Sequence, residues 1–174
     1  AQDYVSRFGF ERRLIPPYLT MALGAGSVTV EQMAVGYAAF ANGGFRIEPY
    51  FIDRILDGKG QVIHKAKPKR AQGDAARIID GRNAFIMTSL MQDVIRGGTG
   101  ARAMQLGRND LAGKTGTTND QVDAWFAGFN PKLVAIAWIG FDNPRSLGGS
   151  ETGGIAALPI WMHFMGSALK GTPE

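Results

Sequence analysis

The segment Lys114-Thr115-Gly116-Thr117-Thr118 brings a cation, three hydroxyls and a glycine together on consecutive residues. It stands where a β-strand is expected to begin, so Thr115 and Thr117 would share a face about 6.6 Å apart. Two hydroxyls at that spacing can both donate to one carboxylate, and Gly116 between them lets a ligand backbone approach closely. The segment therefore predicts a strand that holds an anionic, peptide-like ligand against its backbone.

The backbone of such a strand adds to this chemistry if it lies at a sheet edge. Its free N–H and C=O groups can pair with an extended peptide, and one N–H can form half of an oxyanion hole for acyl transfer. Lys114 adds positive charge and can relay a proton, but alternation places it on the opposite face from Thr115, so it must act around the strand edge or through the twist. The alternative is a polar edge strand without a ligand, because Lys and Thr are common on exposed edges.

Gly113-Lys114-Thr115 also resembles the end of a phosphate-binding loop, which requires Gly, four residues, and then Gly-Lys-Thr or Gly-Lys-Ser. The upstream candidate is Gly107, and five residues, Arg108 to Ala112, separate it from Gly113. The residues from Gly116 to Asp120 are also unsuited to the helix whose N-terminus would bind phosphate. A nucleoside triphosphatase is therefore not expected.

Further strands are predicted on both sides of this segment. Asp123 to Phe129 and Leu133 to Phe141 are expected to be strands joined by the tight turn Asn130-Pro131-Lys132. A separate hairpin is predicted upstream, with strands from Phe51 to Leu56 and from Gln61 to His64 around the turn residues 57–60. Strands joined by such turns indicate antiparallel pairing.

Two helices are predicted before the motif. The capping box Thr29-Val30-Glu31-Gln32 begins the first, which Asn42-Gly43-Gly44 ends. The strongest helix is expected from Asn83 to Arg96. The segment Gly97-Gly98-Thr99-Gly100 follows it, and we interpret this segment as a helix cap and turn, with a ligand loop as the alternative. Its expected apolar stripe, with methionines filling the core, consists of Met87, Leu90, Met91 and Val94.

Helical segments are also expected at both ends of the chain. Residues 1–25 are predicted to form a short helix and a loop, and a last helix is predicted from about Ile155 to Leu169 with Pro159 in its first turn. Trp125, Trp138 and Trp161 are expected to be core aromatics. The order of helices and consecutive strands predicts an α+β fold, an antiparallel sheet packed with helices.

Composition limits the classes of function. The 174 residues are 45% hydrophobic, which suits one domain or part of one. The net charge is +4, but the basic residues are scattered, so no nucleic-acid partner is expected, and the basic stretch Lys65 to Gly73 is interpreted as an exposed loop. The chain has no cysteine, and His64 and His163 have no partners at metal-ligand spacing, so thiolate chemistry is excluded and no metal or other cofactor is expected. The chain has no apolar run long enough to span a bilayer, and it is expected to be a piece of a longer protein.

Lys114 to Thr118, followed by Asp123-Ala124-Trp125-Phe126, resembles the third motif of the penicillin-binding proteins and the strand after it. Other segments resemble the same family in the same order, namely Met33 to Gly44, Gly97 to Gly100 with Ala103, Ile139 to Asp142, and Glu151 to Gly154 with Pro159-Ile160-Trp161. These segments span nearly the whole chain. The resemblance is to the bifunctional, class A penicillin-binding proteins, nearest the Gram-negative 1a type.

The resemblance implies that residues 1–174 are the C-terminal portion of a transpeptidase domain with the serine β-lactamase and penicillin-binding protein fold. That domain carries Ser-x-x-Lys with the nucleophile, then Ser-x-Asn, then Lys-Thr-Gly. Ser-x-Asn does not occur here, and Ser167-Ala168-Leu169-Lys170 fits the first motif but follows Lys-Thr-Gly. We interpret Ser167 as part of a helix surface and expect the chain alone to be inactive.

In the intact enzyme that the resemblance implies, a serine attacks the penultimate D-Ala carbonyl of a peptidoglycan stem peptide and expels the terminal D-Ala. The acyl group then passes from the serine to an amine on a neighbouring strand. β-Lactams would acylate the same serine. The resemblance assigns the ligand carboxylate to Thr115 and Thr117 with Thr118 near, and the oxyanion hole to the Thr117 amide. Gly116 would belong to the substrate-binding strand, and Lys114 would tune the field around the serines.

The resemblance also implies the partners of the chain. They are stem peptides, β-lactams and the N-terminal half of the same domain. The resemblance also implies that the protein works at the periplasmic side of the inner membrane, anchored through a segment outside this chain. A non-catalytic peptide-binding module of the envelope is the alternative function. If strands of the domain are missing from this chain, the edge of the sheet that they would cover is exposed. Self-association through that edge is therefore a further expectation.

Overall fold

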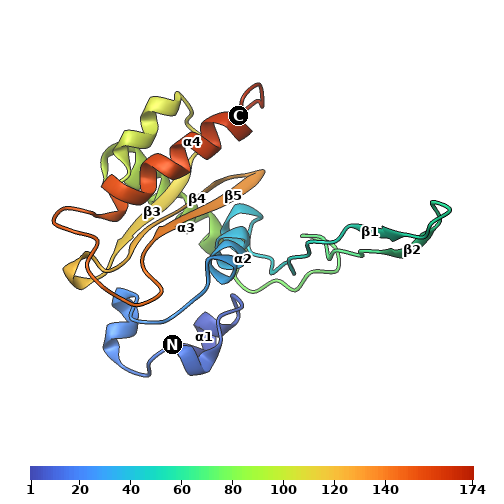
Figure 1. The fold of residues 1–174 in the computed structure, drawn as a ribbon, viewed down its shortest axis with the longest axis horizontal. Coiled ribbons are helices and arrows are strands. Elements are labelled where there is room, and N and C mark those ends of the chain that lie inside the picture. The colour runs from blue at the N-terminus through green and yellow to red at the C-terminus, as the bar shows by residue number, and fades with distance from the viewer.

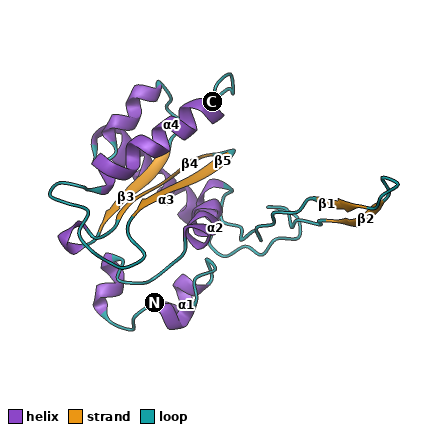
Figure 2. Cartoon of the chain, viewed as in Figure 1, coloured by secondary structure: helices purple, strands orange, loops and turns teal.

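The computed structural model describes all residues from Ala1 to Glu174 as an antiparallel sheet between helices, with a projecting hairpin (Figures 1 and 2). The sheet has the order β3-β4-β5, formed by β3 (Ala112–Thr117), β4 (Ala124–Asn130) and β5 (Leu133–Ile139). Helix α4 (Leu158–Ala168) lies above the sheet in this view and α2 (Val30–Ala41) lies below it. The predicted α+β fold is confirmed.

The core lies on both faces of the sheet. On one face Phe126 of β4 packs against Trp161 of α4, with 4.8 Å between ring centroids, in a buried cluster that also contains Ile95. On the other face Phe129 packs with Met91. The sequence of β4 is almost continuously apolar, which is typical of a strand that is covered on both faces.

The turn between β4 and β5 is the predicted one. The side-chain Oδ1 of Asn130 accepts hydrogen bonds from the backbone N–H groups of Lys132 at 3.1 Å and Leu133 at 2.8 Å. Such a bond closes a turn without help from distant residues. Strand β5 ends at Ile139, two residues before the predicted end at Phe141.

Helix α2 begins at the predicted capping box. The Thr29 hydroxyl accepts from the N–H of Gln32 at 3.1 Å, and the Gln32 side chain accepts from the N–H of Thr29 at 2.9 Å. The helix ends at the expected place, with Asn42 as its C-cap. Local hydrogen bonding alone therefore fixes its first residue.

Helix α3 (Gly81–Gly97) contains the predicted segment, but the predicted apolar stripe is wrong in part. Met91 is buried as expected, together with Ala84 and Ile95, whereas Met87 and Leu90 are exposed. The buried residues follow the spacing i, i+7, i+11, so the face that contacts the sheet is rotated away from Met87 and Leu90. Contact with β3 decides which apolar residues are covered.

The predicted last helix has two parts. Gly153–Ala157 form a π-helical turn, η5, and the α-helix α4 begins only at Leu158, with Pro159 in its first turn as predicted. The prediction of α-helix from Ile155 is therefore wrong for its first residues. These residues pack against β3 and β4, and that contact sets their backbone.

The predicted short helix at the start of the chain is α1 (Gln2–Ser6). Two further short helical segments that were not predicted follow it, η1 (Arg12–Leu14) and η2 (Leu19–Leu23). Two further short segments flank β3, namely η3 (Ala101–Leu106) and η4 (Asn119–Gln121). None of the helices is both long and apolar enough to cross a membrane.

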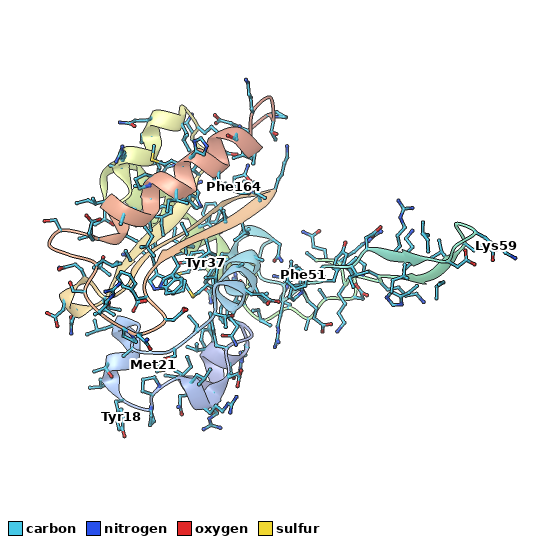
Figure 3. The ribbon with its side chains drawn as sticks, viewed as in Figure 1. Tyr18, Met21, Tyr37, Phe51, Lys59 and Phe164 are labelled. Carbon is cyan, nitrogen blue, oxygen red and sulfur yellow. The ribbon has the colours of Figure 1, made fainter.

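The predicted hairpin is confirmed, although its first strand is shorter than expected and its second strand is shifted by one residue. It consists of β1 (Arg54–Leu56) and β2 (Val62–Lys65), which pair antiparallel. Asp57 accepts bonds from the N–H groups of Lys59 and Gln61, both at 2.8 Å, and closes the turn. The hairpin projects from the body as an arm, with Phe51 near its base and Lys59 at its tip (Figure 3).

Candidate functional site

The predicted ligand-binding strand is β3, and it lies at one edge of the sheet. It pairs with β4 only, so alternate N–H and C=O groups point away from the sheet. The strand starts at Ala112, two residues before the motif, and stops at Thr117. Thr118 lies in the turn to β4, where its hydroxyl accepts from the N–H of Asp123 at 2.7 Å.

Thr115 and Thr117 share a face, as predicted, and both contact segments outside the sheet. The Thr115 hydroxyl lies 2.7 Å from the hydroxyl of Thr99, and the Thr117 hydroxyl accepts from the N–H of Gly153 at 3.0 Å. Thr115 is half-buried and Thr117 is exposed. Gly116 lies between them and pairs with Trp125 of β4. The two hydroxyls are thus held in place and face the same side.

Lys114 lies on the opposite face from Thr115, as alternation predicted, and its side chain is exposed. Its Nζ donates to the backbone carbonyl of Thr115 at 3.0 Å. The ammonium group therefore bends back to its own strand. This geometry keeps a positive charge beside the backbone that would pair with a ligand.

A groove of about 1090 Å³ adjoins the strand and is lined by all five motif residues, 114–118. Its walls come from the sheet and from the N-terminal segment, where Met21 and Tyr37 contribute. Figure 3 shows Tyr37 below the sheet and Met21 on the segment beneath it. Burial raises the pKa of Tyr37 to about 12, so its phenol stays neutral. The groove is largely apolar, with the cation of Lys114 at its edge.

Two tryptophans form a wall of this groove. Trp125 and Trp138 have ring centroids 5.8 Å apart, and both are only half-buried. The prediction that all three tryptophans are core residues is therefore correct for Trp161 alone. Trp125 and Trp138 lie on the face of the sheet opposite Trp161, where no helix covers them fully. Asp123 accepts from Nε1 of Trp138 at 2.8 Å and so connects the turn after the motif to this wall.

The structure adds two residues to the site that the sequence did not identify, Thr99 and Gly153. Both lie in glycine-rich segments, and the sequence favours a helix cap and turn for the one that contains Thr99, with a ligand loop as the alternative. Gly98 is indeed the C-cap of α3. The local sequence carries no sign that either loop returns to β3. By contrast, Ser167 is on α4, and neither it nor Lys170 lines the groove.

The open strand edge and the two hydroxyls are compatible with a peptide ligand that ends in a carboxylate. An extended peptide could pair with the open edge of β3, and its carboxylate would reach the hydroxyls of Thr115 and Thr117. The ammonium of Lys114 would add a favourable charge nearby.

Comparisons of the sequence and of the structure with known proteins all find penicillin-binding proteins. The family model of the penicillin binding protein transpeptidase domain matches residues 3–159. Penicillin-binding protein 1A of Neisseria flavescens is 52% identical over 172 residues, which are 99% of this chain and 22% of that protein. The crystal structure of penicillin-binding protein 1A from Haemophilus influenzae has a TM-score of 0.94 and 38% identity, over 99% of this chain and 31% of that one. Penicillin-binding protein PonA1 from Mycobacterium tuberculosis has a TM-score of 0.78 and 31% identity, over 91% of this chain and 43% of that one.

Proposed function

The chain belongs to the penicillin-binding protein transpeptidase family, and we propose that it supplies the substrate-binding strand of a D,D-transpeptidase that cross-links peptidoglycan stem peptides. This membership confirms the family resemblance that the motifs indicated. The observation that carries the proposal is the edge strand β3, on which Thr115 and Thr117 present two hydroxyls beside an open groove. A carboxylate accepts hydrogen bonds only, so two aligned donors suit it.

Each residue of the motif has a role in this proposal. Thr115 and Thr117 bind the terminal carboxylate of a stem peptide or a β-lactam, with Thr118 near. Gly116 lets the ligand backbone approach the strand, and the N–H of Thr117 forms part of the oxyanion hole. Lys114 supplies positive charge that favours the ionised groups of the reaction centre.

We propose that the serine nucleophile comes from a segment of a longer protein, outside residues 1–174. Within the chain, the only Ser-x-x-Lys is Ser167 to Lys170, and it lies away from the groove. Ser27 lines the groove, but Val30 stands where that motif requires lysine. The apolar groove has room for the segment that brings the nucleophile to β3. The chain alone is then inactive, and the longer protein acts at the periplasmic side of the membrane.

The test is to map the site of acylation. The full-length protein that carries this chain is incubated with a fluorescent penicillin, digested and analysed by mass spectrometry. We expect one modified serine, outside residues 1–174, and no adduct on the isolated chain. An adduct on Ser27 or Ser167 would overturn the assignment of the nucleophile. A full-length protein that binds stem peptides without any acylation would instead be the non-catalytic module.

A further inference from the structure

The loop that follows α3 is held rigidly beside the ligand-binding strand. The N–H groups of Gly98 and Gly100 both donate to the carbonyl of Val94, at 3.1 and 3.0 Å. A side chain on Gly98 would lie 2.9 Å from Val94, and one on Gly100 would lie 3.3 Å from Phe126, so both positions favour glycine. The residue between them, Thr99, is exposed and reaches β3.

Thr99 makes a short hydrogen bond with a residue proposed to bind the ligand. Its Oγ1 lies 2.7 Å from Oγ1 of Thr115, which is the usual length of an O–H···O bond. Only one of the two hydroxyl hydrogens can lie between the oxygens. If Thr99 donates, the hydrogen of Thr115 is free to donate to a ligand. If Thr115 donates, that hydrogen is used within the protein.

The neighbouring hydroxyl shows the same arrangement with its direction already fixed. The Oγ1 of Thr117 accepts from a backbone N–H of Gly153, which can only donate. The hydroxyl hydrogen of Thr117 is therefore free to point to a ligand. Thr99 has the equivalent position beside Thr115, but as a hydroxyl it can act either way.

We infer that Thr99 is a positioning residue that makes the site selective for a free carboxylate. This inference rests on the proposed function. When a carboxylate is bound, Thr99 donates to Thr115, and Thr115 and Thr117 both donate to the ligand. An ester or a primary amide is a weaker hydrogen-bond acceptor than a carboxylate. A primary amide also brings N–H donors, but in this arrangement the hydroxyl oxygens of Thr115 and Thr117 already accept hydrogen bonds from Thr99 and Gly153. Unpaired polar groups of this kind are costly, which is how such a site discriminates.

The experiment compares ligands with and without the carboxylate. Acylation rates of the full-length protein are measured for benzylpenicillin and for its methyl ester, in the wild type and in Thr99→Val and Thr99→Ser. We expect Thr99→Val to lower the rate for benzylpenicillin about tenfold, because a hydrogen bond to a charged group is weakened, and to change the rate for the ester less than about twofold. Thr99→Ser keeps the hydroxyl and should keep the preference of the wild type.

Controls separate this inference from a structural effect and from the proposed function. Thr172→Val removes a hydroxyl near the C-terminus, outside the residues that line the groove, and should leave both rates and the melting temperature unchanged. If Thr99→Val keeps the wild-type preference, or lowers both rates equally, the inference is wrong although the proposed function stands. If no penicillin reacts with the wild type, the proposed function fails. The same comparison is then made by equilibrium binding of a peptide that ends in D-Ala-D-Ala and of its C-terminal amide, where equal binding by wild type and Thr99→Val would overturn the inference.

Discussion

The backbone N–H of Gly153 donates to the hydroxyl of Thr117 at 3.0 Å, across a separation of 36 residues. The close approach depends on the absence of a side chain at Gly153. A Cβ there would lie 2.2 Å from the carbonyl oxygen of Trp125 and 2.5 Å from that of Gly116. The turn η5 therefore rests directly on the backbone of β3 and β4, and it holds the one exposed hydroxyl of the strand.

Gly153→Ala should damage both the fold and the site. The added methyl group has to push η5 off the sheet, so we expect a loss of about 1–3 kcal/mol in the free energy of unfolding. The hydroxyl of Thr117 loses its donor at the same time, so acylation of the full-length protein by penicillin should also slow. Thermal unfolding and penicillin labelling measure the two effects. Gly149→Ala in the same loop meets nothing within 4 Å and should behave as wild type; equal behaviour of the two variants would contradict the argument.

A mostly buried ion pair stabilises the end of the sheet away from the motif. Arg108 donates to Asp110 through two nitrogens, at 2.9 and 2.7 Å, and Asn130 donates to the same carboxylate at 3.0 Å. Burial pushes the pKa of Asp110 up, but the hydrogen bonds from Arg108 and Asn130 outweigh it and hold the pKa below the usual 3.8. The ionised form of Asp110 therefore stabilises the fold.

The pH dependence follows from this lowered pKa. Because the pKa is lower in the folded state, the stabilisation is complete above the unfolded value and is lost as the pH falls through the folded value. Asp110→Asn should lower the free energy of unfolding by about 1–3 kcal/mol at neutral pH, and the difference from wild type should shrink below about pH 4. Asp93→Asn, which breaks the exposed pair with Arg96, is the control and should cost less than about 1 kcal/mol. Denaturant unfolding at several pH values would reveal a constant difference if Asp110 played no such part.

The projecting arm should be separable from the rest of the fold. Its strands β1 and β2 pair with each other, and Phe51 and Ile63 are exposed by 88% and 68%. The arm joins the body at the bridge between Phe45 and Arg77, where the guanidinium lies 4.2 Å from the centre of the Phe45 ring. Replacing residues 50–68 of the full-length protein by a short Gly-Ser linker should therefore change the melting temperature little and leave its acylation by penicillin unchanged. Phe45→Ala, at the buried junction, should cost about 3 kcal/mol; a large loss on removing the arm would mean that it packs elsewhere in the longer protein.

The sequence predicted best those features that depend on nearby residues. The capping box of Thr29 and Gln32, the turn closed by Asn130 and the hairpin turn at Asp57 each rest on bonds spanning two to four residues. The placement of Thr115 and Thr117 on one face is also a local feature, because it follows from the alternation of side chains along a single strand. Such features are independent of how distant parts of the chain meet.

Features that depend on distant contacts could not be predicted in this way. The face of α3 that is buried depends on its contact with β3. For this reason the prediction that Met87 and Leu90 are buried is wrong. The bonds of Thr99 and Gly153 to the strand connect residues 16 and 36 positions apart, and no local pattern encodes them. The sequence therefore predicted the strand of the proposed site, but it did not predict that the loops of Thr99 and Gly153 contact the hydroxyls of that strand.

The role of Thr117 can be tested by two substitutions that differ in one group. Thr117→Val keeps the shape of the side chain but removes the hydroxyl, so the ligand carboxylate loses a donor and the N–H of Gly153 loses its acceptor. A hydrogen bond to a charged group contributes about 1.5–3 kcal/mol, so acylation of the full-length protein by penicillin should fall roughly 10- to 100-fold. Thr117→Ser retains the hydroxyl and should stay within about threefold of wild type. Acylation of the valine variant at nearly the wild-type rate would show that the carboxylate is bound elsewhere, because the valine side chain has no group that can donate a hydrogen bond to it.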